Sequence, residues 1–298
     1  MSESLNAQSI SIVLPNYNGR SLLEKNLPSL ISAAEEYVYE IIVVDDHSTD
    51  DSVVFLKQTY PEIIIIESGI NNGFSITCNK GIKIAKYEFI CVSNTDVTFT
   101  KNYFTCALES FTSPEIFAVK GDIINYKNNF DNIIVIERVF QLYFKRGFLR
   151  FNPNVTPLHV HNSAAINAQF VLLGCCFICR GDMLKELDGY DEIYSPFYWE
   201  DSDLAQRALR KGYTLIYNDK CIIHHELSAT ISTNISNIKR RLVSNRNKFI
   251  FTWRHLRGAN NWFLHIFYTT LNLLTRWLTL DWKYYVAFLT ALHTIIRT

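Results

Sequence analysis

Short apolar runs rich in β-branched residues alternate with amphipathic stretches in the first third of the chain. The apolar runs cover residues 9–14, 41–44, 63–66 and 89–92. Apolar residues at helical spacing lie between them, at residues 23–34, 51–58 and 75–85. Apolar runs of this length are typical of strands buried on both faces, as in parallel sheets. The alternation therefore predicts a doubly wound α/β sheet whose ligand lies across the carboxyl ends of the strands.

Polar segments follow three of these predicted strands directly. They are residues 15–19 (PNYNG), 45–50 (DDHSTD) and 93–96 (SNTD). Turns and helix caps are enough to explain one loop of this composition. Three such loops at the same edge of a sheet favour a ligand site instead.

The composition bears on partners and on compartment. The chain has 298 residues, with 29 Lys and Arg against 29 Asp and Glu, so it lacks the basic field that collects on nucleic acid, and we expect no nucleic-acid partner. The first ten residues do not resemble a secretory signal, and we expect a cytoplasmic protein with reduced cysteines. The cysteines at 175, 176 and 179 lie in the apolar run 170–179, where packing in a buried strand explains them better than a metal site does.

Three acids begin a predicted helix further along the chain. Glu200, Asp201 and Asp203 precede an apolar helical face at residues 204, 205, 208 and 209. Acids at a helix N-terminus are either caps and dipole partners or functional groups, and we interpret Asp203 as the cap. The stretch 125–154 has no clear period, and we describe it only as insertion loops or acceptor-side surface.

The C-terminal segment differs in character from the rest. Residues 258–275 contain no Asp, Glu, Lys or Arg, and a second apolar run covers residues 284–296. The first run is at the lower limit for a membrane span, and the second is too short. Because Trp and Tyr are mixed with Arg and Lys here, we predict two helices that lie in the membrane interface. Helices that merely cover the core, or a true span, are the alternatives.

Five segments, in order, resemble the family-2 glycosyltransferases, whose nucleotide-binding fold is called GT-A. They are residues 11–18 (SIVLPNYN), 43–52 (VVDDHSTDDS), 71–74 (NNGF), 187–191 (LDGYD) and 199–204 (WEDSDL). The resemblance covers about residues 9–256 and favours the rhamnosyltransferase-like branch. It implies an α/β GT-A domain at residues 1–235 and a C-terminal helical segment at residues 236–298.

The resemblance implies a nucleotide-sugar donor. Asp45 corresponds to the family residue that accepts the imide N–H of a uracil or thymine base. Pro15 and Tyr17 would form the wall beside the base and ribose. Gly73 would allow the backbone to approach the nucleotide closely.

The resemblance also implies a divalent cation, Mn²⁺ or Mg²⁺, on the donor diphosphate. The family's D-x-D motif corresponds here to Asn94-Thr95-Asp96, so an amide replaces the first carboxylate. Asp96 is the predicted metal ligand, and Asn94 would meet the ribose or a metal-bound water. His225 is the second predicted ligand, because it fits the family's His-x-x-Ser-x-Ser/Thr spacing better than His224; an ordinary polar residue at a strand end is the alternative.

Asp201 is the predicted catalytic base. A carboxylate is ionised at neutral pH, and in the family the Asp of this Glu-Asp pair takes the proton of the acceptor hydroxyl. Direct displacement by one base implies inversion at the anomeric carbon. The Gln-x-x-Arg-Trp signature of processive synthases is absent, because Leu273 precedes Arg276-Trp277 where Gln would be required. This favours a single addition.

We therefore expect an inverting enzyme that transfers one sugar from a UDP- or dTDP-sugar to a hydroxyl of a cell-surface polysaccharide or lipid-linked glycan. We expect it at the inner face of the cell membrane. A catalytically degenerate transferase, kept as a membrane-bound nucleotide-sugar binding partner, is the alternative that Asn94 motivates. A sugar nucleotidyltransferase is disfavoured, since the loop after the first strand is not rich in Gly and contains no Lys.

Overall fold

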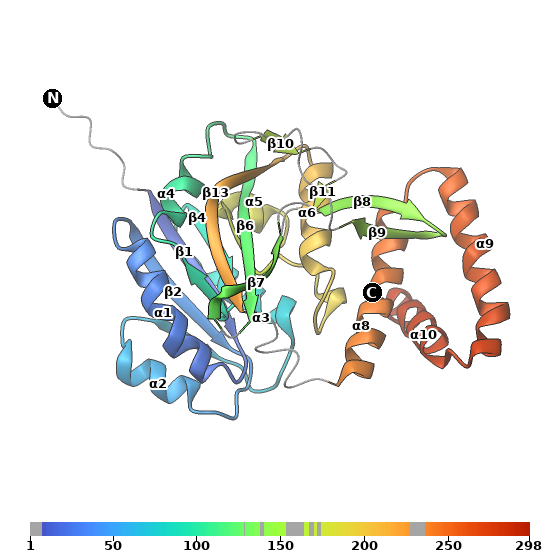
Figure 1. Cartoon of the computed structure of the whole chain (residues 1–298), viewed down its shortest axis with the longest axis horizontal. Helices are drawn as coiled ribbons and strands as arrows, with labels where there is room; N and C mark the ends of the chain where they lie inside the picture. Colours follow the sequence, from blue (N-terminus) through green and yellow to red (C-terminus); the bar gives the residue numbers. More distant parts are fainter. Residues whose placement is uncertain are drawn as a thin grey trace.

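A mixed sheet with helices on both faces forms the body of the molecule, and further helices lie beside it (Figure 1). The computed structural model describes residues 8–127, 129–137, 140–152, 164–166, 170–171, 174–226 and 236–298. The strand order is β10-β13-β6-β12-β4-β1-β2-β3, with β5 paired to β13 and β7 paired to β6. This confirms the predicted α/β fold class.

The N-terminal half of the sheet is parallel. Its strands are β1 (Ser9–Asn16), β2 (Val38–Asp45), β3 (Ile64–Glu67) and β4 (Phe89–Ser93). The connecting helices are α1 (Arg20–Ala34), α2 (Ser52–Thr59) and α3 (Phe74–Ile84). Each of these elements lies where the hydrophobic pattern predicts it. Parallel pairing brings the three polar loops to one edge of the sheet.

The other half of the sheet mixes strand directions. β12 (Cys176–Arg180) is antiparallel to β4 and to β6 (Ile116–Lys127), whereas β13 (Thr214–Glu226) is parallel to β6. The shorter partners are β5 (Val97–Phe99), β7 (Asn129–Glu137) and β10 (Ala164–Ile166). The prediction of one strand over residues 170–179 was wrong. β11 (Phe170–Val171) pairs with β8 (Phe140–Lys145) in a second sheet, and a bend at Gly174 and Cys175 precedes β12.

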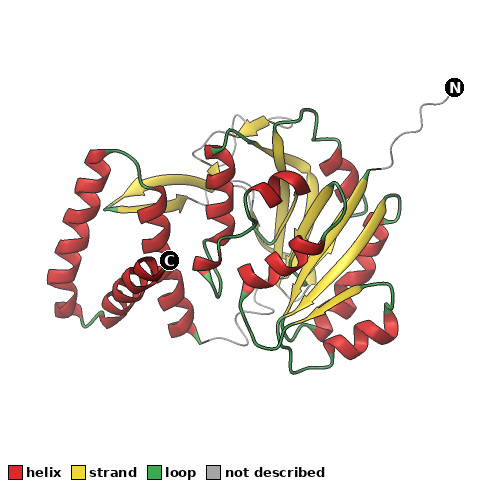
Figure 2. Ribbon diagram, turned by 180° about the vertical axis from the view of Figure 1, so that it is seen from behind, coloured by secondary structure: helices red, strands yellow, loops and turns green. Residues whose placement is uncertain are grey.

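Two apolar layers hold the helices on the sheet (Figure 2). On one face, Leu27 of α1 and Phe104 of α4 (Tyr103–Leu108) pack with strand residues such as Ile10. On the other face, α3, α5 (Gly181–Glu186) and α6 (Glu200–Arg210) contribute buried residues such as Leu184 and Leu204. Cys176 and Cys179 are buried in these layers, as the prediction of strand packing requires.

The C-terminal unit contains α8 (Asn237–His255), α9 (Ala259–Thr275), the short η2 (Arg276–Thr279) and α10 (Trp282–Arg297). A hairpin of β8 (Phe140–Lys145) and β9 (Phe148–Asn152) reaches from the body of the molecule to these helices (Figure 1). Phe148 of the hairpin shares a buried cluster with Phe249 and Tyr284. The two predicted C-terminal helices are confirmed as α9 and α10. Within the described ranges, none of the helices has the length and apolarity needed to cross a membrane.

Candidate active site

The carboxylate of Asp45 is fixed at the carboxyl end of β2. Asn16, its register partner on β1, donates from Nδ2 to Asp45 Oδ2 at 2.8 Å, and the Ser48 backbone N–H donates to Oδ1 at 2.9 Å. Pro15 and Tyr17, both half-buried, lie at the neighbouring end of β1. Asp45, Pro15 and Tyr17, the three residues predicted to contact the nucleobase and ribose of the donor, thus lie at adjacent strand ends.

Asp46 is a residue that the sequence analysis did not assign. Its buried carboxylate accepts the backbone N–H groups of Asn72 and Gly73, at 2.9 Å and 2.8 Å. Gly73 has a φ of +87°, and a Cβ added to it would lie 2.5 Å from Pro196 Cα. Only glycine fits there. Asp46 therefore fixes the loop that leads into α3. In the sequence, its position directly after Asp45 is the feature that could have identified it as a site residue.

Asp96 and His225 meet where β5 pairs with β13. His225 is opposite Val97 in the antiparallel register, and its Nε2 lies 3.4 Å from Asp96 Oδ1. That oxygen is buried and accepts no hydrogen bond from any residue the structure describes. A carboxylate oxygen without a donor beside an imidazole nitrogen suits a divalent cation, so these residues fit the implied metal. Asn94, half-buried two residues before Asp96, is held by its backbone N–H, which donates to Cys175 O at 2.8 Å.

Asn125 of β6 orients the imidazole, which the sequence analysis did not foresee. Its Oδ1 lies 2.7 Å from His225 Nδ1, and the Asn125 side chain is fully buried. An amide oxygen only accepts hydrogen bonds, so Nδ1 must carry a proton, and Nε2 is the nitrogen that faces Asp96 and would be deprotonated when it binds a cation. This is the tautomer that a metal ligand requires.

Glu200 and Asp201 occupy the first turn of α6. Tyr198 and Trp199, which precede it, have φ values of +76° and +80°. Burial and the charge of Asp201 raise the pKa of Glu200 well above its usual range. Burial also raises the pKa of Asp201, but the backbone and hydroxyl of Ser202 and the charge of Lys120 oppose this rise. Glu200 is therefore the acid that keeps a proton longer, and Asp201 is the one that ionises first.

Lys120 is a buried lysine on β6 beside these acids. Its side chain is 1% exposed, and its Nζ makes no hydrogen bond in the part of the chain that is described. Burial lowers its pKa, whereas the charges of Glu137 and Asp201 raise it. Cys175 interacts electrostatically with both Asp96 and Lys120. Lys120 thus interacts electrostatically with Asp201 and, like Asp96, with Cys175, which links the acid pair to the metal-ligand candidates.

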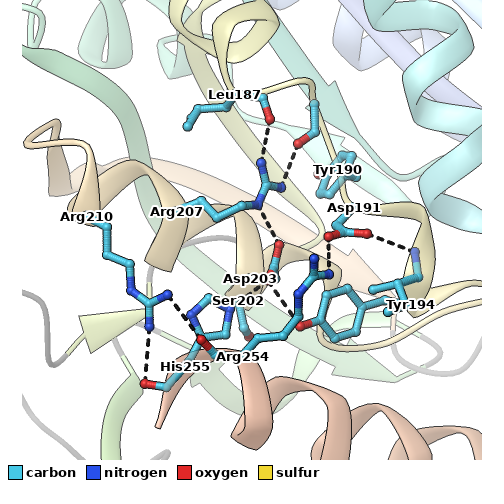
Figure 3. Close-up of polar contacts among 12 residues, drawn as sticks. Leu187, Tyr190, Asp191, Tyr194, Ser202, Asp203, Arg207, Arg210, Arg254 and His255 are labelled. Atoms are coloured by element: carbon cyan, nitrogen blue, oxygen red, sulfur yellow. Dashed lines mark hydrogen bonds and ion pairs between the residues drawn. The ribbon is translucent and has the colours of Figure 1, made fainter. Parts of the chain in front are cut away.

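Asp203 is not the helix cap that we predicted. Its carboxylate accepts from Arg207 Nε at 2.6 Å, Tyr194 OH at 3.1 Å and His255 Nε2 at 2.6 Å, as Figure 3 shows. Trp199 holds the N-cap position, and there is no side-chain cap. Burial alone would raise the pKa of Asp203, but the hydrogen bonds from His255 and Arg207 outweigh it and lower the pKa. Asp203 thus joins α6 to α8.

The comparisons with known proteins agree with this arrangement. The model of glycosyl transferase family 2 matches residues 11–171. The chain belongs to this family. Among curated proteins, the poly(ribitol-phosphate) beta-glucosyltransferase of Bacillus spizizenii is 41% identical over 92 residues, which are 29% of this chain and 14% of that protein. This transferase therefore spans only a small part of that relative.

A second relative matches over most of both chains. The N-acetylglucosaminyl-diphospho-decaprenol L-rhamnosyltransferase of Mycobacterium tuberculosis is 22% identical over 241 residues, which are 74% of this chain and 77% of that one. Among solved structures, GalNAc-T7 with UDP, GalNAc and Mn²⁺ has a TM-score of 0.64 and 15% identity, covering 84% of this chain and 48% of that one. The structural likeness supports the GT-A fold of this family-2 glycosyltransferase.

Proposed function

We propose that this glycosyltransferase moves a single sugar from a UDP- or dTDP-sugar to an acceptor hydroxyl, with inversion at the anomeric carbon. The observation that carries the proposal is the convergence of two groups. Asp96 directly precedes β5, His225 lies on β13 and Asp201 lies on α6. Lys120 interacts electrostatically with Asp201 and with Cys175, and Cys175 also interacts with Asp96. A leaving diphosphate and an attacking hydroxyl need these two kinds of residue in one crevice.

The donor nucleotide is assigned to the loops after β1 and β2. Asp45 keeps acceptor capacity beyond the two hydrogen bonds that orient it, and this suits the imide N–H of uracil or thymine. Pro15 and Tyr17 would lie against the base and ribose, and Asn94 would meet the ribose or a metal-bound water. Gly73, fixed by Asp46, would allow the nucleotide close to the backbone.

Asp96 and His225 would hold Mn²⁺ or Mg²⁺. When bound, such a cation neutralises charge on the diphosphate leaving group. Asn125 keeps the imidazole in the ligand tautomer. The solved relative with UDP and Mn²⁺ supports a divalent cation in proteins of this fold.

Asp201 would accept the proton of the acceptor hydroxyl. Burial raises the pKa of this carboxyl, but Ser202 and Lys120 limit the rise, so Glu200, whose pKa is raised well above its usual range, would carry the proton that the pair retains. A base that takes the proton directly from the nucleophile predicts one displacement and therefore inversion. Two curated relatives named for ribitol-phosphate and decaprenol acceptors support a cell-surface polysaccharide or lipid-linked glycan as the acceptor.

We retain the division into a transferase domain at residues 1–235 and a C-terminal segment at residues 236–298. We also propose that this segment contacts the inner face of the cell membrane. Large apolar side chains are exposed along α9, η2 and α10, including Phe263 at 69%, Leu274 at 66% and Leu280 at 84%. Exposed apolar surface of this extent is typical of an interaction site.

The test is transfer from labelled UDP- and dTDP-sugars in the presence of Mn²⁺ or Mg²⁺, with anomeric configuration read by proton NMR. We expect Asp201→Asn to lose at least about a hundredfold in kcat, the lower limit typical of a general base. Asp203→Asn is the matched control, because it alters an acid of the same helix outside the transfer chemistry. A retained configuration would refute single displacement. Nucleotide-sugar binding without transfer to any acceptor would favour the degenerate transferase instead.

A further inference from the structure

A cavity of about 290 Å³ lies in the C-terminal unit, between the β8–β9 hairpin and helices α8, α9 and α10. Cationic side chains come to it from separate elements of the chain. Its charged lining residues are Arg146, Arg150, Lys248, Arg276 and Asp281. The cavity therefore collects four cations and one carboxylate.

The single carboxylate of the cavity is already engaged. Asp281 forms an ion pair with Arg276, whose Nε also donates to Asn272 Oδ1 at 2.9 Å. Among the described residues, Arg150 donates to a backbone carbonyl, Lys145 O, at 3.3 Å. Across the described ranges, neither Arg146 nor Lys248 has a carboxylate partner. Three positive charges thus share a small space without a counter-ion among the residues that the structure describes.

Lys248 shows the electrostatic consequence of this crowding. Burial, together with the charges of Arg150 and Arg276, lowers its pKa to about 8. A lysine in this position costs folding stability near neutral pH, because its charged form is disfavoured in the folded state. A bound anion would remove that cost.

The walls of the cavity are preformed. Gly147 O at the hairpin tip accepts a hydrogen bond from His265 Nδ1, and His265 Nε2 accepts one from Trp253 Nε1 at 2.8 Å. Phe148 packs edge-on against Phe249, with ring centroids 4.9 Å apart. These contacts hold the hairpin on α8 and α9 and keep the cations together.

We propose that this cavity binds the phosphate group of an anionic membrane lipid, with Lys248 and Arg150 as its main ligands. A phosphate oxygen matches both the ammonium and the guanidinium donors. The lipid is the source that the surroundings favour, because exposed apolar side chains border the lining on α9 and η2. They are Leu271 at 43%, Leu274 at 66%, Trp277 at 62% and Leu278 at 66% exposure. Acyl chains could lie on these residues while the head group enters the cavity.

The cavity is distinct from the proposed donor site. Lys120 Nζ lies 5.5 Å from the ring of Phe140, the first residue of β8. Arg150 and Phe148 pair with Tyr143 and Lys145, further along that strand. At ~3.3 Å per residue the cavity lining begins roughly 10–17 Å along the hairpin from Phe140. The proposal needs the membrane contact proposed above, but it does not depend on sugar transfer.

The experiment measures flotation of the full-length protein with phosphatidylcholine vesicles, with and without phosphatidic acid. Lys248→Met and Arg150→Gln are compared with Arg257→Gln, which removes an exposed cation of the same unit outside the cavity lining. A cation that only lies near an anionic surface contributes about 1 kcal/mol, or about fivefold in affinity. We expect the cavity variants to lose more than about tenfold and the control to lose fivefold or less. Circular dichroism melting should show Lys248→Met folded and at least as stable as wild type near neutral pH.

The outcomes distinguish a lipid-phosphate site in the cavity from diffuse attraction to the membrane and from a site for free phosphate. Equal losses in all three variants would overturn the cavity as a phosphate site and leave only diffuse attraction. Vesicle binding that ignores phosphatidic acid would overturn it as well, while membrane contact itself would stand. Inorganic phosphate is tested separately by calorimetry, and saturation by phosphate without competition from vesicles would overturn the lipid source. Loss of transfer activity is not a readout, so failure of the proposed enzyme function would leave these results unchanged.

Discussion

Two acids in the first turn of α6 lie in opposite environments, and this allows a direct test of their roles. Burial raises the pKa of Asp201 from its ordinary value of 3.8, whereas the contacts of Asp203 outweigh burial and lower its pKa. The folded protein therefore disfavours the charge on Asp201 and depends on the charge on Asp203. Neutralising each residue should have opposite effects on stability and on catalysis.

Asp203→Asn should destabilise the protein by about 3–5 kcal/mol, the usual cost of breaking a buried ion pair from one side. The Asp203 side chain is 1% exposed and that of His255 is 2% exposed, so water cannot replace the lost carboxylate. Arg207 would keep its hydrogen bonds to the carbonyls of Leu187 and Gly189 but would lose its counter-charge. At roughly 2–4 °C per kcal/mol, the melting temperature should fall by about 6–20 °C.

Asp201→Asn should leave the melting temperature at pH 7 unchanged or higher, because it removes a charge whose burial is unfavourable. Its transfer rate should collapse, whereas Asp203→Asn, assayed well below its melting temperature, should keep kcat within about tenfold of wild type. The assays are thermal denaturation followed by circular dichroism and initial transfer rates on the same preparations. A large stability loss in Asp201→Asn would refute its assignment as a functional acid, and an unchanged melting temperature in Asp203→Asn would refute the network argument.

The pH dependence of protein stability tests the direction of the Asp203 pKa shift. The pKa of Asp203 is lower in the folded state, so its stabilising contribution is present above about pH 4, near the unfolded pKa, and is lost as the pH falls through the folded value. The stability gap between wild type and Asp203→Asn should therefore shrink towards acid pH. A gap that widens on acidification would contradict the assigned direction.

Three further variants probe the crevice. Lys120→Met should lower kcat and raise the acid-limb pKa of the rate profile, because Asp201 loses a nearby positive charge. An unmoved acid limb would count against this role of Lys120. Asn125→Ala should weaken apparent Mn²⁺ affinity by about 10–100-fold, measured by titration of activity and by electron paramagnetic resonance of free Mn²⁺, since the His225 tautomer is no longer fixed. Asn94→Asp should tighten Mn²⁺ binding in the same assays, with Asn94→Ala as its control, because a second carboxylate would join Asp96; unchanged affinity would place Asn94 away from the metal.

The sequence was sufficient for the parallel half of the sheet because strands buried on both faces leave an uninterrupted apolar pattern. It also predicted that His225 and Asp96 belong to one site, through a spacing shared with the family. It could not predict Asn125 or Lys120 as site residues. Their roles depend on the pairing of β6 with β13, two strands that lie roughly a hundred residues apart in the sequence. One feature of the sequence did indicate Lys120, because a lysine directly follows the apolar residues 116–119.

The role of Asp203 was mispredicted for a similar reason. An acid near a helix start matches the cap pattern, but its partner His255 comes from α8, 52 positions later. The stretch 125–154 also resisted interpretation, because β7, β8 and β9 are partly exposed and carry mixed polar residues. Where strands of this kind form is determined more by tertiary pairing than by the local sequence pattern.

The backbone before Glu200 links the C-terminal unit to the proposed chemistry. Tyr198 and Trp199 both have left-handed φ values, a conformation that costs of order 1–3 kcal/mol for each such residue. Asn247 of α8 donates from Nδ2 to the carbonyls of Tyr194, Phe197 and Tyr198, at 2.7, 3.0 and 2.9 Å. Trp199 also packs on Phe251, with ring centroids 5.0 Å apart. Because a net hydrogen bond contributes about 1 kcal/mol, these contacts are of the size needed to offset the strain, and α8 thereby helps to fix where Glu200 and Asp201 begin the helix.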